Sequence, residues 1–330
     1  MTERIPSGTR DVLPDEMREL HALVERLRGV FDAHGYGEVS TPTLEYEATL
    51  TRGDLGGVTS AYRLFDEQGN VLVLRSDMTI PIARVASSRY SQAEPPLRFC
   101  YVAHAYRGVR MHQGQAREFL QAGIELLGAP APDGTVEALT VLCAALDASG
   151  LETYRIGLGD ASLYPALLDA VGVAPDRRHG VLHELVTRDF VGLEREIRAL
   201  GLPAGDAELL LRMPQLRGGP EVLAELPATM AGPVAGLRAV HDGLPEAARE
   251  RIIFDLGLAR SLGYYTGAVF DVYDPALGVP IGGGGRYDDL LGRFGRPLPA
   301  VGFALGVERL HMALAGEGEG PLGRRGRPTR

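Results

Sequence analysis

The feature that most constrains the fold is a pair of long segments, residues 97–107 and 117–127, joined by a short loop that contains Gly and Arg. Alternate residues of the second segment form two chemically different sets. One set is Leu120, Ala122, Ile124 and Leu126, and the other is Arg117, Phe119, Gln121, Gly123 and Glu125. Because successive side chains of a strand point to opposite faces, the pattern predicts two long antiparallel strands with one apolar and one polar face.

Two interpretations of the polar face remain open. An antiparallel sheet often turns one face to water, which would make this face an ordinary surface. The mixture of glycine, amide, carboxylate and guanidinium at alternating positions is also suited to lining a pocket for a small zwitterion.

Patterns on either side of this strand pair predict helices and a β-hairpin. Apolar residues recur at helical spacing over residues 17–31, with Asp15 as the expected cap and Gly35 as the expected stop. Residues 62–65 and 71–75 surround a Gly69-Asn70 turn and predict a β-hairpin. Further helices are expected from about residue 135 and through residues 163–168, with a strand at 154–158 between them.

The chain divides into three predicted parts. Residues 1–170 and 250–315 form one α+β core. Residues 171–249 are rich in Ala, Leu and Arg at helical spacing and are broken by Gly and Pro, which predicts a helical insertion. Residues 316–330 alternate Gly with charged residues and cannot bury a core, so they predict a flexible tail.

Composition excludes several functions. The net charge of the 330 residues is −9, which argues against broad nucleic-acid binding. The two cysteines are far apart, and no Cys or His has metal-ligand spacing, so neither a disulfide framework nor a metal site is expected. No apolar stretch is long enough to span a membrane, and there is no leader-like segment, so we expect a cytoplasmic protein.

Four consecutive glycines, residues 282–285, precede Arg286. Backbone N–H groups of such a run can approach a phosphate, but the run matches neither GxGxxG nor a P-loop. A tight turn beneath a binding pocket is an equally good interpretation. Read residue by residue, the chain is a small-molecule binder without an assigned reaction.

Seven blocks, in order, resemble the catalytic core of histidyl-tRNA synthetases. They are PSGTRDVLP (6–14), LRSDMT (74–79), YR (106–107), REFLQAGIE (117–125), LARSLGYY (258–265), GGGRY (283–287) and AVGFALGVERL (300–310). The resemblance implies the class II aminoacyl-tRNA synthetase fold, an antiparallel sheet flanked by helices, with a helical insertion. It also implies dimerisation around residues 42–45. The anticodon-binding domain of that family is not expected here.

The same resemblance implies a histidine-binding pocket. Asp77 with Thr79, next to Gln121, would receive the α-ammonium group, and Glu125 with Tyr264 would meet the imidazole. Arg107 and Arg260 would face the carboxylate. The expected histidine-binding residues are Asp77, Thr79, Arg107, Gln121, Glu125, Arg260, Tyr264 and Tyr265.

Three departures from the synthetase pattern concern catalysis. Val109 stands in place of a Glu, and Gln115 in place of an Arg, in the loop that folds over ATP in that family. Gly263 replaces an Asp beside Arg260. Because charge stabilisation on the reacting phosphate dominates such chemistry, we expect no catalytic residues, no metal and no cofactor.

With these departures, the chain resembles the family of ATP phosphoribosyltransferase regulatory subunits. That resemblance implies a non-catalytic dimer that joins a short-form catalytic subunit in a hetero-oligomer, enables the first step of histidine biosynthesis and responds to histidine as an effector. It implies no tRNA and no membrane partner. The alternatives are a histidine-adenylating enzyme, a truncated histidyl-tRNA synthetase whose tRNA-binding part is another chain, and a folded remnant without a ligand.

Overall fold

The computed structural model describes residues 5–53, 61–108, 116–258 and 263–319. Its centre is a nine-stranded sheet with the order β1-β5-β6-β12-β11-β10-β7-β9-β8. These strands are β1 (Gly37–Glu38), β5 (Leu97–Tyr106), β6 (Glu118–Leu127), β12 (Ala300–Gly306), β11 (Gly282–Arg286), β10 (Ala268–Tyr273), β7 (Arg155–Asp160), β9 (Ile252–Asp255) and β8 (Arg217–Gly218). A separate three-stranded sheet has the order β2-β4-β3.

The long strand pair is confirmed. β5 and β6 are antiparallel from Leu97 opposite Leu127 to Tyr106 opposite Glu118. The sheet as a whole is mixed, because β1 pairs parallel with β5 and β7 pairs parallel with β9. Its middle, from β5 to β7, is antiparallel.

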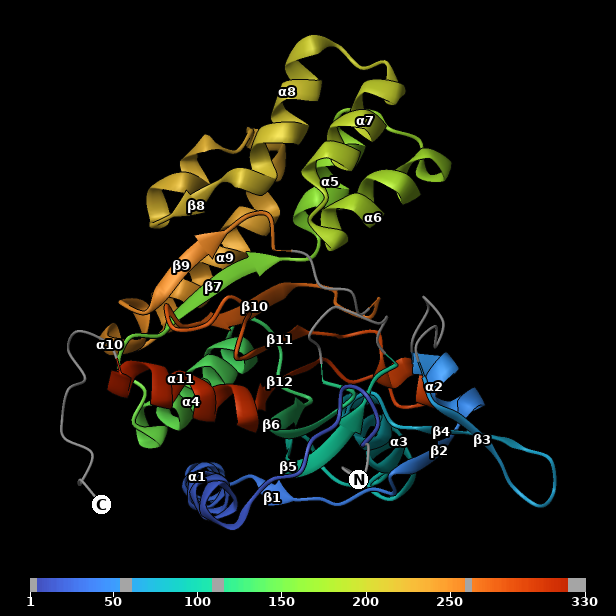
Figure 1. Ribbon diagram of the computed structural model, residues 1–330. Helices are drawn as coiled ribbons and strands as arrows, with labels where there is room; N and C mark the ends of the chain where they lie inside the picture. The colour runs from blue at the N-terminus through green and yellow to red at the C-terminus, as the bar shows by residue number, and fades with distance from the viewer. Residues whose placement is uncertain (1–4, 54–60, 109–115, 259–262, 320–330) are drawn as a thin grey trace.

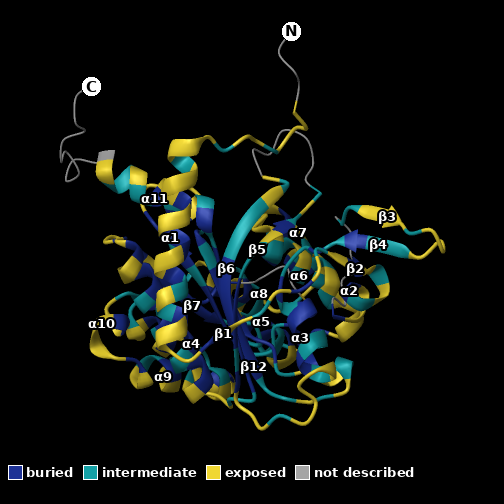
Figure 2. Cartoon of the chain, turned by 90° about the horizontal axis from the view of Figure 1, so that it is seen from below, coloured by how far each residue is buried: buried dark blue, intermediate teal, exposed yellow. Residues whose placement is uncertain are grey.

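Helices cover one face of this sheet. α1 (Pro14–Ala33), α4 (Asp133–Ser149) and α11 (Val307–Glu319) pack together over β6 and β12 (Figure 1). The predicted apolar set of β6 points toward them, with Ala122, Ile124 and Leu126 in the main hydrophobic core. Figure 2 shows these central strands buried beneath helices whose outer sides are exposed.

The opposite face of β5 and β6 has its own, smaller core. It contains Tyr101, Tyr264 and Tyr287, together with Ile80 and Ile82 of α3 (Thr79–Ser88). α2 (Glu47–Gly53) and the 3-10 helix η5 (Leu291–Phe294) contact α3 on this side. The predicted polar face is therefore buried at Gly123 and Glu125, whereas Arg117, Phe119 and Gln121 are partly exposed.

The hairpin prediction is confirmed. β3 (Arg63–Phe65) and β4 (Val71–Leu74) are antiparallel, and Gly69 has φ 81° in the turn between them. Together with β2 (Leu44–Tyr46) they form the small sheet, from which the hairpin projects away from the body (Figures 1 and 2).

The expected helix cap was wrong. Leu13 is the residue before α1, and no side chain caps the helix there, because Pro14 already occupies its first turn. Asp15 lies in that first turn, where it pairs with Arg18. At the other end, Gly35 leaves the helix with φ 78°, as the stop signal predicted.

Residues 171–249 are mostly helical. They contain α6 (Arg178–Thr187), α7 (Phe190–Leu200), α8 (Ala204–Arg212), α9 (Ala231–Gly243), α10 (Glu246–Arg249) and the 3-10 helices η1 (Pro175–Arg177), η2 (Met213–Gln215), η3 (Pro220–Glu225) and η4 (Ala228–Met230). They follow α5 (Leu163–Ala170). The segment is tied to the core, since β8 pairs with β9 and α9 contacts α4 and β7. Its status as a separate unit remains a prediction.

The four glycines form a strand and not a turn, which corrects the sequence interpretation. β11 lies between β10 and β12 in the middle of the sheet. A Cβ on Gly284 would overlap the carbonyl oxygen of Gly302 and lie 2.7 Å from Cα of Phe303. The glycine run therefore lets neighbouring strands approach closely. At the C-terminal end, α11 continues to Glu319, past the expected start of the tail at residue 316.

We predict that Gly284→Ala lowers the free energy of unfolding by about 2 kcal/mol, because the added methyl meets backbone that cannot move independently. Urea unfolding measures the change. Gly278→Ala is the matched control, since a Cβ there has nothing within 4 Å. Equal stability of the two variants would contradict the close-approach explanation.

Candidate functional site

Glu125 lies at the bottom of the polar face of β6. Its side chain is almost completely buried, with 1 % relative exposure. The carboxylate accepts a hydrogen bond of 2.7 Å from the hydroxyl of Thr79, at the start of α3, and a second from the hydroxyl of Tyr287. A buried carboxylate held by two hydroxyl donors is the central polar group of this site.

Burial raises the pKa of Glu125 to about 8. The hydrogen bonds from Tyr287 and Thr79 lower the pKa and only partly offset burial, while the charge of Asp77 raises it further. Burial also raises the pKa of Tyr264 and Tyr287 well above the ordinary phenol value, so both remain neutral hydroxyls.

Glycines make room for these side chains. A Cβ on Gly302 of β12, which is directly opposite Glu125, would overlap the Glu125 carboxylate. A Cβ on Gly123 would lie 2.6 Å from the hydroxyl of Tyr101, and one on Gly285 would lie 2.8 Å from the ring of Tyr265. The site is thus sunk into the sheet at positions that carry no side chain.

Three tyrosine rings form one wall. The ring of Tyr264 lies 4.9 Å from that of Tyr265 and 5.6 Å from that of Tyr287, measured between centroids. Tyr264 and Tyr287 are buried, and Tyr265 is partly exposed. The wall is apolar apart from its hydroxyl groups, which suits a small ring.

Asp77 supplies a second carboxylate just before α3. It accepts hydrogen bonds from the backbone N–H of Ile80 (3.1 Å) and from the hydroxyl of Ser76 (3.4 Å). Burial raises its pKa, and the nearby charge of Arg107 acts in the opposite direction. A carboxylate in this position is suited to pairing with a cationic group of a ligand.

Two polar atoms on the same face of β6 have no partner among the described residues. Oε1 of Gln121 and Nε of Arg117 are both buried without a hydrogen bond. Buried polar groups are nearly always satisfied, so unpaired ones favour a ligand or ordered water at this place. Gln121 is four residues from Glu125 and therefore shares its face.

The structure brings six of the expected residues into this region: Asp77, Thr79, Gln121, Glu125, Tyr264 and Tyr265. Arg107 lies just beyond β5, is exposed, and places its guanidinium 5.6 Å from the centroid of the Phe119 ring. Arg260, Val109 and Gln115 lie outside the described residues. The assignment of histidine to these residues remains a prediction.

Tyr287 was not predicted as a site residue. It belongs to the GGGRY block, directly after Arg286 at the end of β11. Arg117 was placed on the polar face but not in the pocket. The alternation of β6 contained this signal, because Arg117 is four residues from Gln121.

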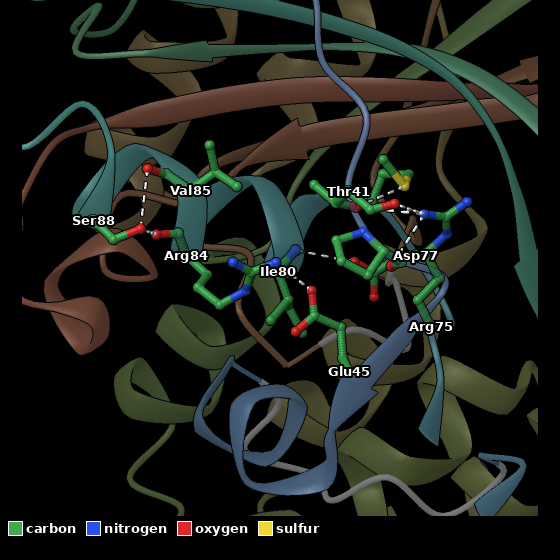
Figure 3. A network of polar contacts seen from close by, with 10 residues as sticks. Thr41, Glu45, Arg75, Asp77, Ile80, Arg84, Val85 and Ser88 are labelled. Carbon is green, nitrogen blue, oxygen red and sulfur yellow. Dashed lines mark hydrogen bonds and ion pairs between the residues drawn. The ribbon is translucent and has the colours of Figure 1, made fainter. Parts of the chain in front are cut away.

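A buried arginine fixes the loop that carries Asp77. The guanidinium of Arg75 donates to the carbonyl oxygens of His104 (2.8 Å), Thr41 (2.7 Å) and Pro42 (3.3 Å). Figure 3 shows this group beside Asp77, and further along α3 it shows Arg84 next to Glu45, with which Arg84 forms an ion pair. The loop is thereby attached both to β5 and to the segment that precedes β2.

These groups are suited to binding a small molecule. Two carboxylates, an amide and a wall of phenols complement a small ligand that carries an ammonium group and a polar ring. In the described ranges, no three His, Cys, Asp or Glu side chains are grouped to hold a metal ion. None of the helices within those ranges is long and apolar enough to cross a membrane.

The fold and the pocket define a class of protein. The family model for histidyl-tRNA synthetase matches residues 8–310. A crystal structure described as histidine–tRNA ligase subunit from Alicyclobacillus acidocaldarius is 33 % identical, with a TM-score of 0.80, and the match covers 97 % of this chain and 99 % of that one.

Two further relatives narrow the class. The ATP phosphoribosyltransferase regulatory subunit of Symbiobacterium thermophilum is 41 % identical over 96 % of this chain and 81 % of its own length. A crystal structure described as an ATP phosphoribosyltransferase regulatory subunit/histidyl-tRNA synthetase from Bacillus halodurans C has a TM-score of 0.86 at 32 % identity, covering 95 % of this chain and 84 % of that one. The chain belongs to the ATP phosphoribosyltransferase regulatory subunits of the histidyl-tRNA synthetase family.

We predict that Glu125 makes the protein less stable as the pH rises. Its folded-state pKa of about 8 is above its ordinary 4.5, so the folded protein keeps a proton that the unfolded chain releases in this window. The free energy of unfolding of Glu125→Gln, relative to the original protein, should therefore increase from pH 5 to pH 8, by at most about 1.4 kcal/mol per pH unit.

Urea unfolding across this pH range measures the difference. Glu208→Gln is the control, because Glu208 is exposed on α8 and should leave the pH dependence unchanged. If the curve of Glu125→Gln runs parallel to that of the original protein, Glu125 does not titrate as a buried group.

Proposed function

We propose that this chain is a non-catalytic regulatory subunit that binds histidine around Glu125 and passes its presence on to an attached ATP phosphoribosyltransferase. The observation that carries the proposal is the buried Glu125, held by Thr79 and Tyr287. It is a ready acceptor for a ring N–H, in a chain whose relatives are named regulatory subunits.

The proposed binding mode uses the geometry of the face. The imidazole stacks into the tyrosine wall, donates one N–H to Glu125 and meets the Tyr264 hydroxyl. The α-ammonium group pairs with Asp77, next to Thr79 and the unpaired Oε1 of Gln121. Arg107 and Arg260 would complete the carboxylate end, with Tyr265 at the partly exposed side of the wall.

A neutral Glu125 is compatible with this mode, and so is a charged one. At a pKa of about 8 the carboxyl group is mostly protonated near pH 7 in the empty pocket. A ligand N–H that donates to the group favours its charged form, so histidine binding should release a proton from Glu125. Binding would thus be linked to pH through this one group.

We propose that the chain is not a catalyst because charged residues of the synthetase pattern are replaced by uncharged ones. Val109 and Gln115 remove a carboxylate and a guanidinium from the loop that would fold over ATP, and Gly263 removes a carboxylate near Arg260. Phosphoryl and adenylyl chemistry depends on such groups for charge stabilisation. Binding energy would shift a population of states instead of lowering a reaction barrier.

The proposed partner is a short-form catalytic subunit, which this chain would enable to carry out the first step of histidine biosynthesis in the cytoplasm and would make sensitive to feedback inhibition by histidine. Coupling between such sites is typically ~1–3 kcal/mol. The chain would also pair with itself. The segment before and within β2 supports this, because Leu44 and Tyr46 are 43 % and 53 % exposed beside the buried Glu45.

We predict that Glu125→Ala abolishes inhibition by histidine while the complex with the catalytic subunit still forms. The reason is that the alanine removes the acceptor for the imidazole without altering an exposed surface. Phosphoribosyltransferase activity of the catalytic subunit, with and without this chain, is measured while histidine is titrated, and calorimetry measures histidine binding directly.

Glu208→Ala is the control and should retain inhibition. Unchanged inhibition in Glu125→Ala would contradict the pocket. A complex whose activity does not depend on this chain would contradict the regulatory role even if calorimetry shows that histidine binds.

A second candidate function is histidine adenylation. Arg107 is retained, and the Alicyclobacillus relative is described as a histidine–tRNA ligase subunit. Histidine-dependent exchange of pyrophosphate into ATP distinguishes it, because a regulatory subunit without the charged loop should show none.

A further inference from the structure

A cavity of about 350 Å³ lies away from Glu125, where the insertion meets the sheet. Its lining residues come from the core and from the insertion: Thr153, Arg155, Gly157, Arg188, Arg217, Ile253, Asp255, Tyr273, Asp274 and Pro275. Small-molecule sites begin at about this size. Figure 1 shows the contributing strands, β10, β7, β9 and β8, at the end of the sheet that lies next to the helices of residues 171–249.

Two guanidinium groups in the lining have no carboxylate partner in the described part of the chain. Arg155 donates to the carbonyl oxygen of Tyr154 (3.0 Å), and Arg188 donates to the hydroxyl of Tyr273 (3.1 Å). Both arginines are exposed. Because Arg155 is opposite Tyr273 in the β7–β10 pair, the two groups flank one tyrosine ring.

The acidic groups of the lining are already engaged. Asp255 is buried and forms an ion pair of 3.1 Å with Arg217. Asp274 is buried and accepts from the Thr153 hydroxyl and from the backbone N–H of Ala276, each at 2.8 Å. The lining itself carries three guanidinium groups and two carboxylates, and the charges of Asp255 and of the neighbouring Asp271 also act on Arg188.

The rest of the cavity is largely apolar. Gly157 leaves room for the ring of Tyr273, since a Cβ there would lie 3.0 Å from that ring. Ile253, Pro275 and the tyrosine ring form the sides. The cavity therefore combines a two-pronged cationic end with a surface for an uncharged body.

We propose that this cavity binds a small phosphate monoester, with Arg155 and Arg188 on the phosphoryl group and the organic part against Ile253, Pro275 and the ring of Tyr273. A phosphate monoester carries close to two negative charges at neutral pH, which matches two unpaired guanidinium groups. The bound molecule joins the core, through Arg155, to the insertion, through Arg188. Ligand in this cavity therefore holds the insertion against β7 and β10.

Isothermal titration calorimetry of the full chain tests the proposal with ribose 5-phosphate, inorganic phosphate, ribose and succinate. Ribose 5-phosphate should bind with a submillimolar Kd, more tightly than inorganic phosphate, and ribose should not bind. Arg155→Gln and Arg188→Gln should each weaken binding of ribose 5-phosphate at least tenfold.

Arg188 has φ 58°, a backbone conformation that is unfavourable for any residue with a side chain. Glutamine in its place has the same backbone strain, so Arg188→Gln changes the charge more than the conformation. Arg238→Gln, on the exposed side of α9, is the control and should change the Kd less than twofold. Thermal unfolding of all three variants confirms that each is folded.

Three outcomes would overturn the proposal. One is no saturable binding of ribose 5-phosphate below 10 mM, about a hundredfold weaker than a 0.1 mM site. Another is equal binding by the original protein and both arginine variants. The third is arginine-dependent binding of succinate without binding of either phosphate, which would assign the cavity to dicarboxylates.

Discussion

The burial of one carboxylate organises the pocket side of this protein. Glu125 is placed inside the sheet because Gly302, directly across from it, has no side chain. Once buried, the carboxylate needs donors, and Thr79 and Tyr287 supply them from two different parts of the chain. The start of α3, the end of β11 and the middle of β6 are therefore held together by a single group. A ligand that also donates to Glu125 has to share or replace these contacts.

The two sites described above lie on the same face of one sheet. Glu125 is opposite Gly302, which pairs with Gly285, then Val269, then Gly159 on β7, next to the cavity. Several of these positions on the strands between the two sites are glycines. Few side chains therefore project from the middle of this face, and larger side chains lie at its two ends. The insertion closes the far end, and α3 with the tyrosine wall closes the near end. One face of a single nine-stranded sheet thus provides two separate binding surfaces.

Much of this could be predicted from the sequence, and the failures have physical causes. The alternation of β6 was decisive because one face is apolar and the other is not, and a period of two admits no other element. The four glycines were misinterpreted because glycine is common both in turns and where strands approach closely, and only the neighbours distinguish the two. Those neighbours, such as Phe303, are distant in sequence. Tyr287 was missed for the same reason, since its partner Glu125 is 162 residues away. The cavity at Arg155 and Arg188 could not be found at all, because its residues come from five separate segments.

Arg75 connects the loop that carries Asp77 to two other segments of the chain, so a movement of this loop affects those segments as well. Its guanidinium donates to three carbonyl oxygens in two segments that are distant from it in sequence: Thr41 and Pro42 before β2, and His104 near the end of β5. A lysine offers a single point of charge and could not span these acceptors. Displacement of Asp77 by a ligand would consequently pull on residues 41–42 through one rigid planar group, outside both hydrophobic cores. Together with the backbone hydrogen bond from Arg75 to Thr43 and the contact of Thr41 with Met78, this side chain links the pocket to the β2 edge of the small sheet.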